Sequence, residues 1–341
     1  MISHEKKNND LLVFWLSSIL LLILIMIIVG GLTRLTNSGL SITNWELFKG
    51  VLPPFDQQSW ETYFQSYKKI PQYKLLFPSM TLSEFKIIFY WEYIHRVLGR
   101  LIGLIVLLPL LYFTFIKKIN IKTLLPFYIV FFLVVLQGIA GWFMVQSGLV
   151  HDVTVSHYRL SLHLILAFII ISVIFWQILN LKKNENKSFF VLTNKRIPFI
   201  FLIFLIFLQV IFGAFVSGLD AGKIYQSWPL MGNNYFPNDL EVIKFNDFLD
   251  LESHSLVQFY HRNIAYFIIF YVIILSFFIF KKKDTKLLKP LYLVIALLTV
   301  QVVLGIFTLL SNLHIVLASS HQITSAILVL SALNLYYNVI K

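Results

Sequence analysis

Eight runs of apolar residues, each long enough to cross a lipid bilayer, constrain this chain more than any other feature. They lie near residues 11–31, 97–116, 125–146, 160–181, 198–217, 263–280, 290–310 and 315–338. A helix needs about 20 apolar residues to span the hydrocarbon layer. The first run is longer than a signal-peptide core and lacks a small-residue cleavage site, which favours a retained helix. We therefore expect an all-α integral membrane protein with eight transmembrane helices.

The charged residues are distributed unequally between the two sides of the predicted membrane. We place both termini and every second connection in the cytoplasm. These segments then hold 16 of the 28 basic residues but only four of the 16 acidic ones, so they carry the whole net charge of +12. Cytoplasmic segments are enriched in Lys and Arg, so this excess indicates topology and not a nucleic-acid partner. The long connections 32–90 and 218–258 are then expected outside.

The chain contains no cysteine. This excludes disulfide bonds, iron–sulfur clusters, thiolate catalysis and zinc sites built on cysteine. Any metal must be held by His, carboxylate, Met or Tyr side chains.

The two halves of the chain resemble each other. "EYIHR" precedes the second apolar run and "QFYHR" precedes the sixth, while "LQGIAGWF" in the third run matches "VQVVLGIF" in the seventh. Aligned residues include Trp45 with Trp228, Gln137 with Gln301, and Gly141 with Gly305. An internal repeat of this kind indicates duplicated architecture. We expect two pseudo-symmetric four-helix bundles, residues 1–183 and 184–341, in parallel orientation.

Four of the nine histidines lie at the outer ends of the even-numbered spans, at matching depth: His95, His163, His261 and His321. Facing side chains inside helix bundles are a common way to hold a cofactor, and two axial imidazoles complete the coordination of a heme iron. We predict one heme between His95 and His163 and another between His261 and His321. His163 is preferred to His157 because it lies inside the apolar run. The remaining histidines fall in a tail or in loops.

Three arginines follow these histidines closely: Arg96, Arg100 and Arg262. A guanidinium group binds a carboxylate through two parallel hydrogen bonds, so these residues are candidates for binding heme propionates. The alternative is that they are helix-end side chains that extend to the membrane surface.

The two halves differ in one titratable residue. Glu92 precedes His95 by three positions, where the second half has the neutral Gln258 before His261. Residues three apart share a helix face, so we expect Glu92 to face the same cavity as His95. An ionisable group in only one of two similar sites suggests that this site performs chemistry while the other carries electrons. The alternative is a simple hydrogen bond at a helix start.

Several motifs together resemble the heme A synthase family, in its alphaproteobacterial and mitochondrial branch. They include "GGLTRLTNSGLSITNW", "EFKIIFYWEYIHRVLGR", "LQGIAGWFMVQSGL", "VSHYRLSLHL" and "QFYHR", in this order. The resemblance implies that a methyl group of heme O is oxidised to the formyl group of heme A for terminal oxidases. His95 and His163 would flank the heme O substrate, and His261 and His321 would ligate heme b. Glu92 matches the acidic residue of the family beside the substrate histidine, and our hypothesis is that it is catalytic: it positions or deprotonates a polar intermediate at the methyl carbon, or relays protons.

We also expect a bacterial inner-membrane protein. A partnership with heme O synthase is expected because an apolar substrate is best handed over within the membrane. The electron donor, the oxygen source and a homo-oligomeric state stay open. The main alternative is a diheme b-type protein that oxidises quinol in the membrane without modifying heme. A transporter, a third reading, would require charged or broken helices at mid-membrane. A complete pair of histidine ligands leaves no coordination position for oxygen, so either one histidine leaves or oxygen is activated elsewhere.

Overall fold

The computed structural model describes residues 2–44, 49–116, 121–150, 152–190, 192–240 and 245–340. Trp45 lies outside these ranges, as do His151 and the basic residues Lys117, Lys118 and Lys341.

Eight helices in the described part of the chain are long and apolar enough to cross a membrane. They are α1 (Ile2–Leu35), α4 (Leu82–Ile116), α5 (Ile121–Val150), α6 (His157–Lys183), α7 (Ile197–Gly218), α8 (His254–Lys282), α9 (Thr285–Leu310) and α10 (Ile315–Val339). The prediction of an all-α, multi-pass membrane protein is therefore confirmed. Three short 3₁₀ turns, η1 (Lys49–Val51), η2 (Ala221–Lys223) and η3 (Phe245–Leu249), lie in the connections after α1 and α7.

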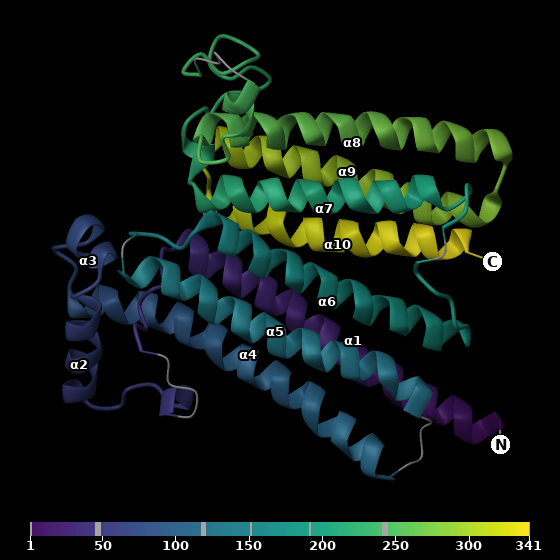
Figure 1. The fold of residues 1–341 in the computed structure, drawn as a ribbon, viewed down its shortest axis with the longest axis horizontal. Coiled ribbons are helices and arrows are strands. Elements are labelled where there is room, and N and C mark those ends of the chain that lie inside the picture. Colours follow the sequence, from purple (N-terminus) through teal and green to yellow (C-terminus); the bar gives the residue numbers. More distant parts are fainter. Residues whose placement is uncertain are drawn as a thin grey trace. The chain divides into compact units, whose positions relative to one another are not determined.

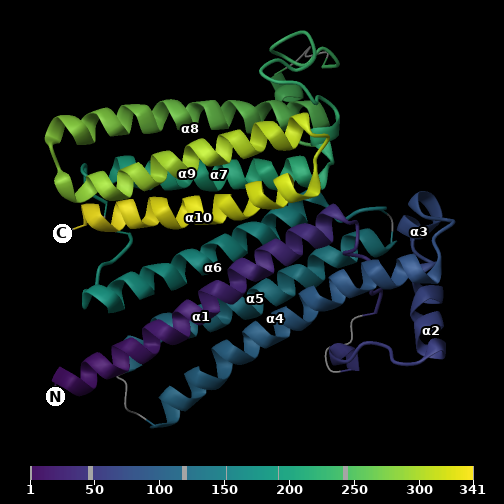
Figure 2. The same cartoon turned by 180° about the vertical axis from the view of Figure 1, so that it is seen from behind.

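Contacts divide the chain into two compact units, one made of Met1–Ser17 with Ile171–Lys341 and the other of Ser18–Ile170. In the first unit, α7, α8, α9 and α10 run alongside one another, as both views show (Figures 1 and 2). The connection between α7 and α8 lies at one end of these four helices, and the C-terminus lies at the other (Figure 1). In the second unit, α4 packs against α5. The boundary at residues 183 and 184, and the pseudo-symmetry of the two bundles, stay predictions.

Helix α4 begins at Leu82, about four turns before the apolar run that predicted it. Its first turns carry Glu84 and Lys86, which lower the hydropathy of the segment, but Phe85 and Phe89 are buried there. Packing of this apolar face extends the helix beyond the membrane-length segment.

The partner of that face is a small folded region within the first long connection. It consists of α2 (Gln57–Tyr67) and α3 (Pro71–Leu76). The Asp56 carboxylate caps α2 by accepting a hydrogen bond of 2.7 Å from the Ser59 backbone N–H. Its apolar residues join α4 in one buried cluster: Leu40, Ile42, Trp60, Phe64, Tyr67, Ile70, Phe85 and Phe89. The connection is thereby fixed against the N-terminal end of α4.

Candidate functional site

Two pairs of histidines face each other inside the helix bundles. His95 of α4 and His163 of α6 have ring centres 6.5 Å apart and ring planes at 67°. His261 of α8 and His321 of α10 have ring centres 6.4 Å apart and ring planes at 77°. The structure therefore brings together the same residues that the sequence paired. His157 begins α6, and its ring lies against that of the adjacent Tyr158.

The spacing within each pair fits one metal ion between the rings. A metal–imidazole bond is about 2.0 Å long and the ring centre lies about 1 Å beyond the nitrogen, so two rings on one ion lie about 6 Å apart. Among the described residues, no group of three or more His, Cys, Asp or Glu side chains could hold a metal ion. A heme iron needs only two protein ligands because the macrocycle supplies the others. The pairs therefore fit hemes better than zinc or copper.

Each of the four histidine rings lies against a glycine of the preceding helix. The pairs are Gly30 with His95, Gly141 with His163, Gly213 with His261, and Gly305 with His321. A Cβ atom added to Gly141, Gly213 or Gly305 would lie only 2.9, 3.1 or 2.9 Å from the Cε1 atom of its histidine. Glycine is therefore required at these positions because the imidazole occupies the space of a side chain.

Three of these glycines follow a glutamine by four residues, so both lie on one helix face. The Gln137 amide donates to the His163 backbone oxygen at 3.0 Å, and the Gln209 amide donates to the His261 backbone oxygen at 2.9 Å. The Gln301 amide nitrogen lies 3.3 Å from Nε2 of His321. The repeat predicted Gln137 and Gln301 as counterparts, but the sequence analysis missed Gln209 and the glycines that precede His95 and His261. The pattern Gln-x-x-x-Gly on α7 is the signal that could have found them.

The same helix face orients the imidazoles. His321 Nδ1 donates to the Gln301 backbone oxygen at 3.0 Å. Residue 305 lies one helical turn after Gln301, and because it is a glycine no side chain covers the Gln301 backbone oxygen. When Nδ1 carries the proton, the lone pair lies on Nε2, the nitrogen that a metal would then bind. The other histidines differ from His321. Nδ1 of His163 lies 3.2 Å from the Gln137 side-chain amide nitrogen, and the buried Nδ1 of His261 has no hydrogen-bond partner among the described residues.

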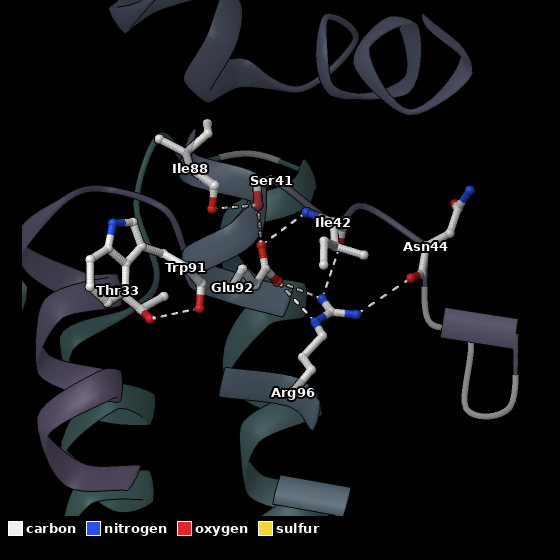
Figure 3. A network of polar contacts seen from close by, with 8 residues as sticks. All are labelled: Thr33, Ser41, Ile42, Asn44, Ile88, Trp91, Glu92 and Arg96. Atoms are coloured by element: carbon white, nitrogen blue, oxygen red, sulfur yellow. Dashed lines mark hydrogen bonds and ion pairs between the residues drawn. The ribbon is translucent and has the colours of Figure 1, made fainter. Parts of the chain in front are cut away.

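Glu92 is buried, with 3% of its surface exposed, and fixes the connection that follows α1 (Figure 3). Its carboxylate accepts hydrogen bonds from the Ser41 hydroxyl at 2.7 Å and the Ile42 backbone N–H at 2.9 Å. It also accepts two hydrogen bonds from Arg96, from Nε at 3.0 Å and from Nη2 at 2.6 Å. Arg96 Nη2 donates in turn to the Ile42 backbone oxygen at 2.8 Å. The hydrogen bonds of the Glu92 carboxylate are thus to this connection and to Arg96.

The second half has an equivalent set of hydrogen bonds, in which the neutral Gln258 replaces Glu92. Gln258 donates from Nε2 to the Tyr225 backbone oxygen at 2.9 Å, and Arg262 donates from Nη2 to the same oxygen at 3.0 Å. In each half, the residues three before and one after the ligand histidine thus hold the connection that follows the preceding helix. The first connection presents donors to a carboxylate, whereas the second presents an acceptor to an amide.

Two of the candidate arginines lie together. Arg96 and Arg100 line one small cavity with Asn44 and Tyr93 at the outer end of α4. Arg262 lies in the other half, where its Nη1 also donates to the Leu230 backbone oxygen at 3.3 Å.

Comparison with known proteins identifies the family. The family model of the cytochrome oxidase assembly proteins, COX15-CtaA, matches residues 13–333. The chain belongs to this family. Its relatives include proteins named heme A synthase from Pelagibacter ubique, 50% identical over 322 residues, and from Rickettsia bellii, 44% identical over 319 residues. A third, from Rickettsia felis, is 41% identical over 318 residues.

The alignments cover nearly the full length of both partners. The Pelagibacter ubique protein matches 91% of this chain and 91% of its own length, and the Rickettsia felis protein matches 92% and 93%. The family resemblance read from the motifs is therefore confirmed. Both histidine pairs lie within the matched residues 13–333.

Proposed function

We propose that this protein is a heme A synthase, which oxidises a methyl group of heme O to the formyl group of heme A. The relatives named heme A synthase support this activity across almost the whole chain. The observation that carries the proposal to the site is the spacing of the two histidine pairs, 6.5 and 6.4 Å between ring centres. Both values match one iron ion for each pair.

The two pairs differ in their surroundings, which supports different roles for them. In our proposal His95 and His163 hold the substrate heme O, while His261 and His321 hold a heme b that relays electrons. Heme iron supplies the redox chemistry when it is bound. Glu92 is the only acidic side chain that is buried among the described residues, and it precedes His95 by three residues on α4. The oxidation of a methyl group releases protons, so the reaction needs an acceptor near the substrate.

Glu92 has a second task in this proposal. Its hydrogen bonds to Ser41 and Ile42 hold the connection after α1 against the outer end of α4. This arrangement keeps water away from the site and keeps Arg96 in place. Arg96 and Arg100 line one cavity, where two guanidinium groups favour a heme propionate. Arg262 is proposed to do the same for heme b.

The experiment that tests the function is extraction of the hemes from the purified protein after co-expression with heme O synthase, followed by chromatography. We expect heme b together with heme O or heme A. Two equivalents of heme b alone would support the diheme electron-transfer protein instead. The Glu92→Gln variant should keep both hemes but yield less heme A, whereas the control Glu61→Gln, the same change at an exposed position of α2, should retain heme A synthesis. A normal yield from Glu92→Gln would refute the catalytic role.

We also propose that the protein lies in the bacterial inner membrane with both termini in the cytoplasm. The unequal distribution of basic residues supports this orientation. Heme O is apolar, so transfer from heme O synthase within the membrane is the route that avoids exposure to water. Alkaline phosphatase fused to the connection 218–258 should be active, and the same enzyme fused to the C-terminus should be inactive.

A further inference from the structure

Helix α1 breaks a pattern that the other odd-numbered helices share. Helices α5, α7 and α9 each carry a glutamine four residues before the glycine that faces a ligand histidine. The glutamines are Gln137, Gln209 and Gln301. In α1 the glycine is Gly30, and the residue four positions earlier is Met26. A thioether sulfur cannot donate a hydrogen bond. His95 is therefore the one candidate ligand without a glutamine on the preceding helix.

Helix α4 is nevertheless built to receive such a glutamine. The residue four positions after each ligand histidine is small, which leaves the histidine backbone oxygen accessible; these residues are Gly99, Ala167, Ala265 and Ser325. The Cε atom of Met26 lies 3.7 Å from the position of a Cβ on Gly99. Met26 thus occupies the place from which Gln137 and Gln209 reach the backbone oxygens of their histidines.

His95 is also held more loosely than its counterparts. A Cβ atom on Gly30 would lie 3.6 Å from the His95 ring, an ordinary contact, whereas the other three glycines leave only 2.9–3.1 Å. Among the described residues, none forms a hydrogen bond with the His95 ring. His163, its partner, receives the Gln137 amide within 3.2 Å of both ring nitrogens. The two ligands of the first pair therefore differ in how firmly the protein orients them.

We propose that His95 is the exchangeable ligand of the first pair, and that Met26 is the positioning residue that keeps it exchangeable. This inference rests on the proposed function, because it assumes a heme between His95 and His163. An iron with two firmly held histidines has no position for a small ligand such as dioxygen. If a heme is bound between the two rings, His163 would be the firmly held ligand, and His95 would be the one that can be displaced. The second pair has donors on both sides and stays closed, as an electron carrier requires.

The test uses the full-length protein loaded with heme, reduced, and titrated with carbon monoxide. We expect the unaltered protein to bind one carbon monoxide for every two hemes. The Met26→Gln variant adds a donor for the His95 backbone oxygen, and should bind carbon monoxide about tenfold more weakly, the effect of roughly one hydrogen bond. Unchanged affinity in a variant that retains both hemes would overturn the proposal.

The matched variant is Gln209→Met, at the corresponding position of α7. It removes the donor to His261, and should raise the stoichiometry from one carbon monoxide towards two for each protein. If Met26→Gln fails to bind heme, this variant decides: a second carbon monoxide supports the inference, and none overturns it. Heme extraction from the same samples tests the proposed function separately. Two equivalents of heme b would refute heme A synthesis, while the carbon monoxide stoichiometry would still report which pair opens.

Discussion

Replacing the glycines that face the histidines tests whether the position of each imidazole requires a residue without a side chain on the neighbouring helix. We consider Gly305→Ala and Gly30→Ala, which add the same methyl group to α9 and to α1. At Gly305 the new Cβ would lie 2.9 Å from Cε1 and 3.3 Å from Nδ1 of His321. At Gly30 the nearest ring atoms would lie 3.6 Å away. The first substitution displaces a ligand, and the second fits the existing space.

The magnitudes follow from packing and hydrogen bonding. Overpacking a tight site costs about 1–3 kcal/mol. Displacement of the His321 ring also breaks the hydrogen bond from Nδ1 to the Gln301 oxygen, which is worth about 1 kcal/mol. Alanine is the better helix former by about 1 kcal/mol, which offsets part of this cost. The net loss of about 1–3 kcal/mol lowers the affinity for heme at this pair by roughly 5- to 150-fold. Gly30→Ala should be neutral or slightly stabilising.

The assay is the heme-to-protein ratio of each purified variant, measured during dilution, together with its reduced absorption spectrum. Gly305→Ala should lose one heme of the two, and Gly141→Ala should lose the other, because a Cβ there would also lie 2.9 Å from its histidine. Gly30→Ala is the matched control and should retain both. Full retention by Gly305→Ala with an unchanged spectrum, or loss of heme by Gly30→Ala alone, would refute the reasoning.

Two further predictions concern charged side chains. Arg100→Ala should weaken retention of the substrate heme and leave the second heme bound, as measured by heme extraction; equal loss of both would contradict a local role. Glu185, which follows α6, has its pKa lowered from the usual 4.5 by hydrogen bonds from Lys187 and Tyr337. Its contribution to stability is therefore present above pH about 4.5 and is lost as the pH falls through the lowered value. Thermal unfolding of Glu185→Gln between pH 3 and pH 6 should show a smaller pH dependence than the unaltered protein.

The sequence predicted the parts of the site that repeat with a regular period. The four histidines could be paired because each lies at the same depth of an apolar run and because "EYIHR" and "QFYHR" mark equivalent helix starts. The spans themselves follow from length and hydropathy. A single glycine in an apolar helix carries no comparable signal, so the contact between Gly30 and His95 could not be read from the sequence.

The contacts of Glu92 show a second limit. Helical spacing correctly places Glu92 and His95 on one face of α4, and on that basis we expected them to share a cavity. The carboxylate instead meets Ser41 and Ile42, which lie about 50 residues earlier in an irregular connection. Irregular backbone has no period, and its position depends on the aromatic cluster that α2 and α3 form with α4. Long-range packing of this kind decides which way a polar side chain turns.

Comparison of the halves shows that net charge does not distinguish the two heme sites. The first has Glu92, Arg96 and Arg100, and the equivalent positions of the second hold Gln258, Arg262 and Tyr266. Each set sums to one positive charge, because the added carboxylate and the added guanidinium cancel.

A difference in the chemistry of the two hemes must therefore come from other sources. In our proposal, Glu92 is a proton acceptor at the first site, a role that the neutral Gln258 cannot have. Met26 cannot donate a hydrogen bond to the His95 backbone oxygen, whereas Gln209 donates one to the His261 backbone oxygen. The first difference adds a negative charge that Arg100 offsets, and the second changes how firmly one histidine is oriented. In our proposal, the two sites therefore share one arrangement of paired histidines and differ in how firmly one histidine is oriented and in one carboxylate.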